Sequence, residues 1–202
     1  MLCLSGLAVS GTAASIDSGQ EGFESHPVAF KAMQHNKKEE AMAEAHYYAK
    51  LVWSGGALGP TKSVENYSRE FRTEFEGKPP LSGSADPGVH GDPTLYNPED
   101  LLMSALSACH MLSYLAVCAH AGIVVLSYED TVVGTLTRRD GRLTFIDVLL
   151  RPKVVLEVGS DIEKARALHD KAHNICVIAN SVNFPVRYEP EIIFTSESVA
   201  AA

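Results

Sequence analysis

Apolar residues concentrate in one long stretch near the middle of the chain, and this stretch is the clearest helix in the sequence. Asn97 is a typical N-cap residue, and Pro98 suits the first helical position. Gly122 is a natural C-terminal stop. The pattern therefore predicts a helix over 97–121. Because this helix is apolar on nearly all sides, we expect it to be central and buried.

Strand-like segments precede this helix. Residues 46–53 are aromatic and aliphatic, and residues 65–76 alternate between two faces. In a strand over 65–76, Arg69 and Arg72 point to opposite faces. The segment 77–95 is rich in proline and glycine, so we expect a loop there.

Two further β-rich segments follow the helix. Residues 123–137 and 142–158 flank Asp140 and Gly141, a turn sequence typical of hairpins. They predict a long β-hairpin.

A second helix and a last strand complete the pattern. Ser160 and Glu163 have the spacing of a capping box, and the helix that they start should end around 180–183. A closing strand is expected over 184–194. Strands that alternate with two helices in this order predict an α+β domain with antiparallel sheet. The expected core stripe of this helix is Ile162, Ala165, Leu168, Ala172, Ile175, Cys176 and Ala179.

Composition narrows the class of protein. The 202 residues are 46% hydrophobic and carry a formal net charge of −8. Lysines and arginines do not cluster as a nucleic-acid surface requires, so we expect no nucleic-acid partner. We also expect no membrane association, since we find no apolar run near the roughly 20 residues of a membrane-spanning helix.

The ends of the chain differ in composition from its middle. We expect a folded domain over 45–195, with a flexible extension over 1–44 and a short tail over 196–202. Residues 1–44 could also be a targeting leader or reflect a misassigned start. They lack the basic region of a secretory signal. Cytoplasmic localisation is expected.

Four cysteines and no C-x-x-C motif are present. Cys109 lies in the central helix, and Cys176 lies in the second one. Both are on apolar stripes, so packed helices could bring the two sulfurs together. They could equally be inert core cysteines, since free cysteine is often buried. Cys118 is expected in the core, and Cys3 in the N-terminal extension.

Histidines raise the question of a metal. His169, His173 and Cys176 have a spacing that could bind zinc on one helix face. A structural zinc site needs four ligands, and no fourth is evident nearby. We therefore expect surface histidines and no metal or other cofactor.

Two segments carry a family resemblance. NPEDLLMSALSACHMLSYLAVCAHAGI (97–123) resembles the central helix of the OsmC/Ohr family, in which a reactive cysteine follows an N-P-E start. AHNICVIANSVNFPVRYEP (172–190) resembles the helix and closing strand that carry the family's second cysteine. GKPPLSGSADPGVHGDP and YSREF resemble one bacterial subgroup. The resemblance covers about 46–190.

The resemblance implies a function and a set of site residues. It implies a thiol peroxidase of the oxidative stress response, with an OsmC-like fold and an intertwined homodimer. Cys109 would be the peroxidatic cysteine, and Cys176 the resolving one. Glu99 matches the family glutamate, and an arginine that pairs with it matches Arg69 or, as runner-up, Arg72. The expected substrates are organic hydroperoxides and hydrogen peroxide, and the reductant is a dithiol or lipoyl-type thiol.

Helix geometry bears on Glu99. It precedes Cys109 by ten residues, which is roughly 15 Å along a straight helix. A glutamate that serves this site must therefore come from a partner chain. By spacing alone, Glu99 could instead be a first-turn carboxylate that interacts with the helix dipole. The alternative for the whole protein is a non-enzymatic, stress-associated dimer that binds a small apolar ligand.

Overall fold

The structure is a computed structural model, and it describes residues 44–195. The chain divides into two units, Met1–Tyr47 and Tyr48–Ala202. Except for Glu44, the predicted extension and tail lie outside the described residues. All helices and strands below belong to the second unit.

The predicted α+β class is confirmed, because two α-helices accompany two sheets that are largely antiparallel. The first sheet has the order β1 (Lys50–Val52), β2 (Phe71–Glu74) and β3 (Leu81–Gly83), and both of its pairings are antiparallel. The second sheet is built on the hairpin of β4 (Val125–Arg139) and β5 (Arg142–Leu156). The predicted hairpin and its turn are therefore confirmed.

The first sheet differs from the sequence prediction in two places. Strand β3 lies within 77–95, where we predicted only a loop, and a short 3-10 helix, Pro87–Val89, follows it. Strand β2 is shorter than predicted and begins after Arg69. The backbone before β2 turns because the Arg69 guanidinium donates hydrogen bonds to carbonyl groups of its own segment. The other 3-10 helix of this region is Ser54–Leu58.

The central helix α1 (Pro98–Ala121) has the predicted ends. The Asn97 side chain accepts a hydrogen bond from the Asp100 amide at 2.8 Å, and the Asp100 carboxylate accepts one from the Asn97 amide at 3.1 Å. These bonds satisfy two amides that the first turn leaves unpaired. Gly122 ends the helix with a φ of 73°, a conformation that glycine adopts without strain.

The second helix, α2 (Ile162–Ile175), begins one residue later and ends earlier than predicted. Asp161 is the N-cap in place of Ser160, because its carboxylate accepts a hydrogen bond from the Lys164 amide at 2.9 Å. Cys176 has extended backbone angles and is the C-cap. A 3-10 helix, Ala179–Ser181, follows separately.

The last segment forms two strands where we predicted one. Strands β6 (Val186–Tyr188) and β7 (Glu191–Phe194) both pair with β5, and both are parallel to it. This edge therefore adds parallel pairs to a domain whose other strand pairs are antiparallel. Pro190 separates the two strands because it has no amide proton for the ladder.

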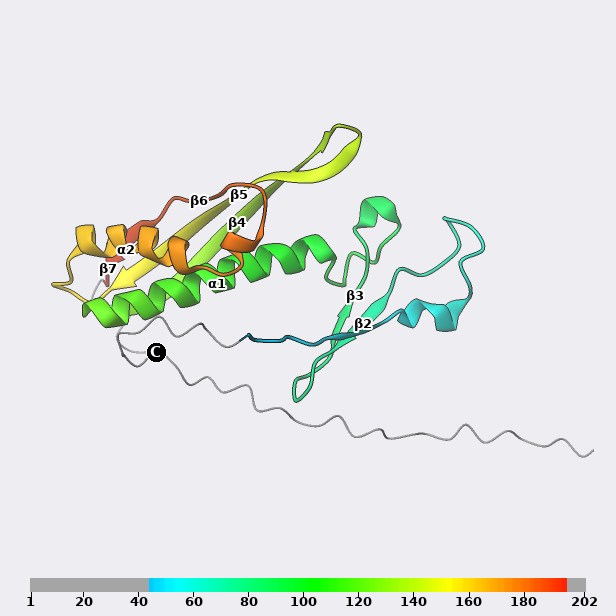
Figure 1. The fold of residues 1–202 in the computed structure, drawn as a ribbon, viewed down its shortest axis with the longest axis horizontal. Helices are drawn as coiled ribbons and strands as arrows, with labels where there is room; N and C mark the ends of the chain where they lie inside the picture. Colours follow the sequence, from blue (N-terminus) through cyan, green and yellow to red (C-terminus); the bar gives the residue numbers. More distant parts are fainter. Residues whose placement is uncertain (1–43, 196–202) are drawn as a thin grey trace, which may run out of the picture. The chain divides into compact units, whose positions relative to one another are not determined.

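The core lies between α1, α2 and the second sheet. Helix α1 runs along the hairpin, and α2 packs against α1 (Figure 1). Apolar side chains form two clusters along α1. Leu106 belongs to one cluster, with Val148, Leu150 and Val186. Tyr114 belongs to the other, with Cys118, Ile123, Val154, Leu156, Ala165, Leu168, Ala172 and Ile192.

A pair of buried histidines lies between these clusters. His110 is 1% exposed and one helical turn from both Leu106 and Tyr114, and His169 is 0% exposed. His110 Nε2 and His169 Nδ1 are hydrogen bonded at 3.1 Å, and the rings stack. The prediction that His169 is a surface residue is therefore wrong. The hydrogen bond compensates part of the cost of burying two polar rings.

Helix α1 also has the length and hydropathy of a membrane-spanning helix. It has 24 residues and a mean hydropathy of 1.7 over its most apolar window, so our expectation that no segment reaches this range is wrong. Central helices of folded domains meet the same criteria. Here, four residues of α1 are buried, namely Leu106, His110, Tyr114 and Cys118.

The buried histidines predict how stability depends on pH. Burial lowers the pKa of His169 to about 3 and that of His110 to about 4. In the unfolded chain both titrate near about 6.5. The unfolded state therefore binds more protons below that pH, and stability falls as the pH drops from about 6.5 toward 4.

We expect each histidine to add at most about 1.4 kcal/mol per pH unit to this slope. Urea unfolding of His169→Gln between about pH 7 and 5, at fixed protein concentration, should show a shallower slope than that of the unmodified protein. His120→Gln is the control, because His120 is exposed at the end of α1. Parallel slopes for His169→Gln and the unmodified protein would contradict the prediction.

Candidate functional site

Two cysteines meet where the end of α2 packs against the middle of α1. Cys109 is half-buried on α1, and Cys176, at the C-cap of α2, is 0% exposed. A side-chain hydrogen bond joins the two sulfurs, and both cysteines are free thiols. The structure thus brings together the two cysteines that the sequence pattern singled out.

The environment of Cys176 favours the protonated thiol. Burial, reinforced by the hydrogen bond with Cys109, raises the pKa of Cys176 to about 11. The amides of Ile178 and Ala179 donate hydrogen bonds to the Cys176 sulfur, and these bonds lower its pKa and so offset part of the increase. The two sulfurs therefore differ: one is partly accessible, and the other is enclosed and holds its proton.

The third described cysteine lies apart from this pair. Cys118 is 1% exposed in the cluster around Tyr114, as predicted for a core cysteine. Burial raises the pKa of its thiol, and a hydrogen bond with Tyr114 only partly offsets this effect. Such a thiol is unreactive. Cys3 lies outside the described residues.

Glu99 is in the first turn of α1, as predicted, and part of its carboxylate lacks a partner. Its Oε2 atom is buried and accepts no hydrogen bond within residues 44–195. A buried carboxylate oxygen normally pairs with a cation or a hydrogen-bond donor. Within residues 44–195, Glu99 forms no hydrogen bond with either cysteine.

Arg69 is held by its own segment. Its Nη1 donates to the Tyr67 carbonyl at 2.5 Å, and its Nη2 donates to the Val64 carbonyl. The guanidinium carbon lies 3.8 Å from the centre of the Tyr67 ring. Its hydrogen bonds thus go to backbone carbonyl groups, and it does not contact Glu99 or Cys109 within one chain.

Arg72 lies on β2 and is already paired with an acid. Its Nε is 3.3 Å from Glu74 Oε1 on the same strand. Like Arg69, it makes no contact with the cysteine pair in the described part of the chain. The site within a single chain therefore contains both cysteines but neither of the two predicted arginines.

Sequence reasoning missed an aromatic cluster next to the cysteines. The Tyr188 ring of β6 lies 5.3 Å from His110, 5.4 Å from His173 and 6.0 Å from His169, measured between ring centres. The Tyr188 hydroxyl donates a hydrogen bond to Asp170. The helical spacing of His110 from Leu106 and Tyr114 could have predicted its burial, but the contact with Tyr188 depends on the position of β6.

The histidines do not form a metal site. Across residues 44–195, no group of three or more His, Cys, Asp or Glu side chains is arranged to hold a metal ion. The zinc-like spacing of His169, His173 and Cys176 is not a preformed site, because His169 Nδ1 is bonded to His110.

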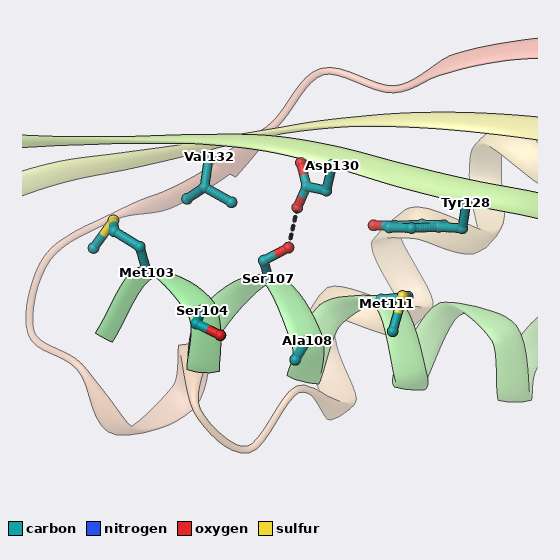
Figure 2. Close-up of a pocket in the computed structure, with 8 residues that line it drawn as sticks. All are labelled: Met103, Ser104, Ser107, Ala108, Met111, Tyr128, Asp130 and Val132. Carbon is teal, nitrogen blue, oxygen red and sulfur yellow. Dashed lines mark hydrogen bonds between the residues drawn. The ribbon is translucent and has the colours of Figure 1, made fainter. Parts of the chain in front are cut away.

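A separate pocket of about 330 Å³ lies between α1 and β4. Figure 2 shows the Ser107 hydroxyl of α1 directed at Asp130 of β4, to which it donates a hydrogen bond of 2.6 Å. Cys109 is not part of the lining, although Ala108 is. The lining consists of Met103, Ser104, Ser107, Ala108, Met111, Tyr128, Asp130 and Val132.

Known proteins share this fold. Residues 91–191 match the family model described as OsmC-like protein. The structure of an OsmC-like protein of unknown function from Vibrio cholerae is 32% identical, has a TM-score of 0.68, and covers 73% of this chain and 100% of its own. An organic hydroperoxide resistance protein from Legionella pneumophila is 19% identical, with a TM-score of 0.54 and coverage of 76% and 99%.

A curated relative agrees with these matches. The uncharacterized protein YmaD of Bacillus subtilis is 24% identical over 153 residues, which are 74% of this chain and 95% of YmaD. The family model spans half of the chain, and the Vibrio cholerae structure aligns over its entire length. By these matches, and with the α+β architecture described above, the chain belongs to the OsmC family.

Proposed function

We propose that this protein is a cysteine-based peroxidase that reduces organic hydroperoxides. The observation that carries the proposal is the hydrogen-bonded pair of a partly exposed Cys109 and an enclosed Cys176. A peroxide can reach only a sulfur with some access to solvent, and a sulfenic acid is best captured by a second thiol already in contact. Two proteins of similar structure are named organic hydroperoxide resistance proteins, which supports the same chemistry.

The proposed cycle has three steps. The Cys109 thiolate attacks the peroxide oxygen, the O–O bond breaks, and a sulfenic acid and an alcohol form. Cys176 then attacks the Cys109 sulfur, so that an S–S bond forms and the S–O bond breaks with release of water. A dithiol or lipoyl-type reductant exchanges with the disulfide and restores both thiols. No metal or organic cofactor takes part.

Apolar residues around the cysteines support a preference for alkyl hydroperoxides. Leu106 lies three residues before Cys109 on α1, and Ile178 lies two residues after Cys176, and both belong to the apolar cluster that includes Leu102. Each buried methylene of a substrate contributes about 0.8 kcal/mol to binding. An alkyl hydroperoxide gains this energy, whereas hydrogen peroxide has no alkyl group to bury.

We assign the missing cation to Arg69, which would pair with Glu99 of a second chain. Glu99 has a buried oxygen without a hydrogen-bond partner within residues 44–195. The Arg69 guanidinium hydrogen bonds there to backbone carbonyls and interacts with Glu65 through charge, but it hydrogen bonds to no carboxylate in this part of the chain. Arg72 is less suited because it already pairs with Glu74. A guanidinium held in bidentate fashion by Glu99 of one chain, beside Cys109 of the other chain, would favour the thiolate.

A homodimer is part of this proposal. Most of α1 is not fully buried in the single chain, and Leu112 is 62% exposed. An apolar helix of this length requires cover on its remaining faces. A second copy of α1 and its sheet would supply that cover together with Glu99.

The pocket between α1 and β4 supports a second candidate, a non-enzymatic dimer that binds a small apolar ligand. Its volume is within the range of small-molecule sites, and Met103, Met111 and Val132 give it apolar walls. Peroxide consumption distinguishes the two candidates, because a binding protein needs neither cysteine for its function.

Removal of each cysteine should have a different effect. Cys109→Ser should abolish peroxide consumption with a dithiol reductant, because the attacking sulfur is gone. Cys176→Ser should consume one equivalent of peroxide and then stall as a sulfenic acid, which mass spectrometry detects. Cys118→Ser is the matched control and should turn over normally. Full turnover by Cys109→Ser, or normal cycling by Cys176→Ser with the same dithiol, would refute the peroxidase.

Arg69 and Arg72 can be separated by their kinetics. Arg69→Gln should slow the oxidation of Cys109 by about tenfold or more, since a nearby cation shifts thiol ionisation by at least one order of magnitude. Stopped-flow measurement of the first oxidation step gives this rate directly. A loss confined to Arg72→Gln would transfer the role to Arg72.

The dimer is tested by its mass in solution. Sedimentation at micromolar concentration should give about twice the chain mass. A dimer that is stable at this concentration is expected to bury more than roughly 2,000 Å² at its interface. A stable folded monomer would refute the dimer and, with it, the pairing of Arg69 with Glu99 between chains.

A further inference from the structure

The second step of the proposed cycle leaves a proton without an obvious acceptor. A thiolate, not a thiol, attacks sulfur, so Cys176 must lose its proton as the S–S bond forms. Attack at sulfur is in line, so the leaving group departs from the far side of the Cys109 sulfur. The Cys176 proton therefore cannot pass directly to the departing hydroxide.

The surroundings of Cys176 accommodate the thiolate and shield it from bulk solvent. The sulfur is enclosed, and the amides of Ile178 and Ala179 hydrogen bond to it. These donors stabilise a negative sulfur but cannot accept a proton. An acceptor must therefore be a neighbouring side chain with a free lone pair.

His173 is the neighbouring base best placed for this role. It lies three residues before Cys176, so the two side chains share one face of α2, and the Cys176 amide donates to the His173 carbonyl at 3.2 Å. Its Nδ1 is buried and has no hydrogen-bond partner within residues 44–195. The ring as a whole is only half-buried, so it connects the interior to solvent.

The other two histidines are poor acceptors. His110 and His169 are bonded to each other and fully enclosed. Burial lowers the pKa of both rings well below neutrality, so they do not hold a proton at physiological pH. The rings of His110 and Tyr188 lie 6.5 Å and 5.4 Å from the His173 ring, measured between ring centres.

We propose that His173 accepts the thiol proton of Cys176 while the Cys176 sulfur attacks the Cys109 sulfur, and then releases that proton to solvent. The inference rests on the proposed function. In the balanced step, the Cys176 S–H bond breaks, its electron pair forms the S–S bond, and hydroxide leaves Cys109 and takes a proton from solvent. His173 ends the step unchanged.

The charged and titratable groups around His173 bear on its pH dependence. From α1 the group is His110, and from β6 it is Tyr188. From α2 itself they are His169 and Asp170. The Asp170 carboxylate accepts a hydrogen bond from the Tyr188 hydroxyl and is therefore already engaged.

The step can be started without peroxide, which separates this inference from the peroxidase proposal. In a Cys3→Ser background, one equivalent of dithiobis(nitrobenzoate) should modify the accessible Cys109 and release one coloured thiolate. Attack by Cys176 on the Cys109 sulfur of that mixed disulfide then releases a second coloured thiolate. The rate of this second phase measures the attack of Cys176, which includes the loss of its proton.

We expect the second phase to be at least about tenfold slower in His173→Asn than in the unmodified protein at pH 7, with the first phase unchanged. In the variant, its rate should rise about tenfold per pH unit between about pH 7 and 9, because Cys176 must then ionise unaided. The unmodified protein should show a shallower rise. His120→Asn is the matched control, since His120 is exposed on α1.

An unchanged second phase in His173→Asn would overturn the inference. A slower phase whose pH dependence parallels that of the unmodified protein would overturn it too, since that result indicates a structural role. If His173→Asn fails to fold, His173→Gln is measured in the same way. Failure of the unmodified protein to consume hydroperoxide would refute the proposed peroxidase, while the exchange assay would still decide the role of His173.

Discussion

The packing of α2 against α1 is the contact on which the rest of this domain depends. It buries the histidine pair, joins two apolar clusters and places the end of α2 beside the middle of α1. Only this end-to-middle arrangement brings the sulfurs of Cys109 and Cys176 together, although 66 residues of intervening chain, including the β4–β5 hairpin, separate them. The hairpin supports the contact because β5 lies against both clusters through Val148, Leu150, Val154 and Leu156.

Local interactions made much of this fold predictable. The ends of α1 follow from Asn97 and Gly122, and the hairpin turn follows from Asp140 and Gly141, because each depends on neighbours in the chain. The pairing of Cys109 with Cys176 was expected from apolar stripes and a family resemblance. The loop around Arg69 was not, since a strand pattern does not reveal a guanidinium that binds its own backbone carbonyls.

Nonlocal pairing accounts for the remaining differences. The parallel addition of β6 and β7 to β5 depends on how the chain returns after α2, and nothing within 184–194 specifies that direction. The burial of His169 likewise depends on His110, 59 residues away. The arginine and glutamate of the proposed site are a stronger case of the same limit. A single chain shows a carboxylate oxygen without a donor and a guanidinium without a carboxylate acceptor. A contact between chains, however, is not encoded in any local sequence pattern.

The position of Cys176 at the C-cap determines how much of the domain a disulfide would disturb. Its backbone angles, φ −72° and ψ 102°, are already outside the helical range. The residue is therefore free of the α2 hydrogen-bond ladder on its C-terminal side and leads into the short turn at 179–181. Oxidation and reduction would shift this connecting segment while α2 stayed intact against α1. The two redox forms would then share one core and one stability-determining contact, and differ mainly in the surface formed by the loop between α2 and β6.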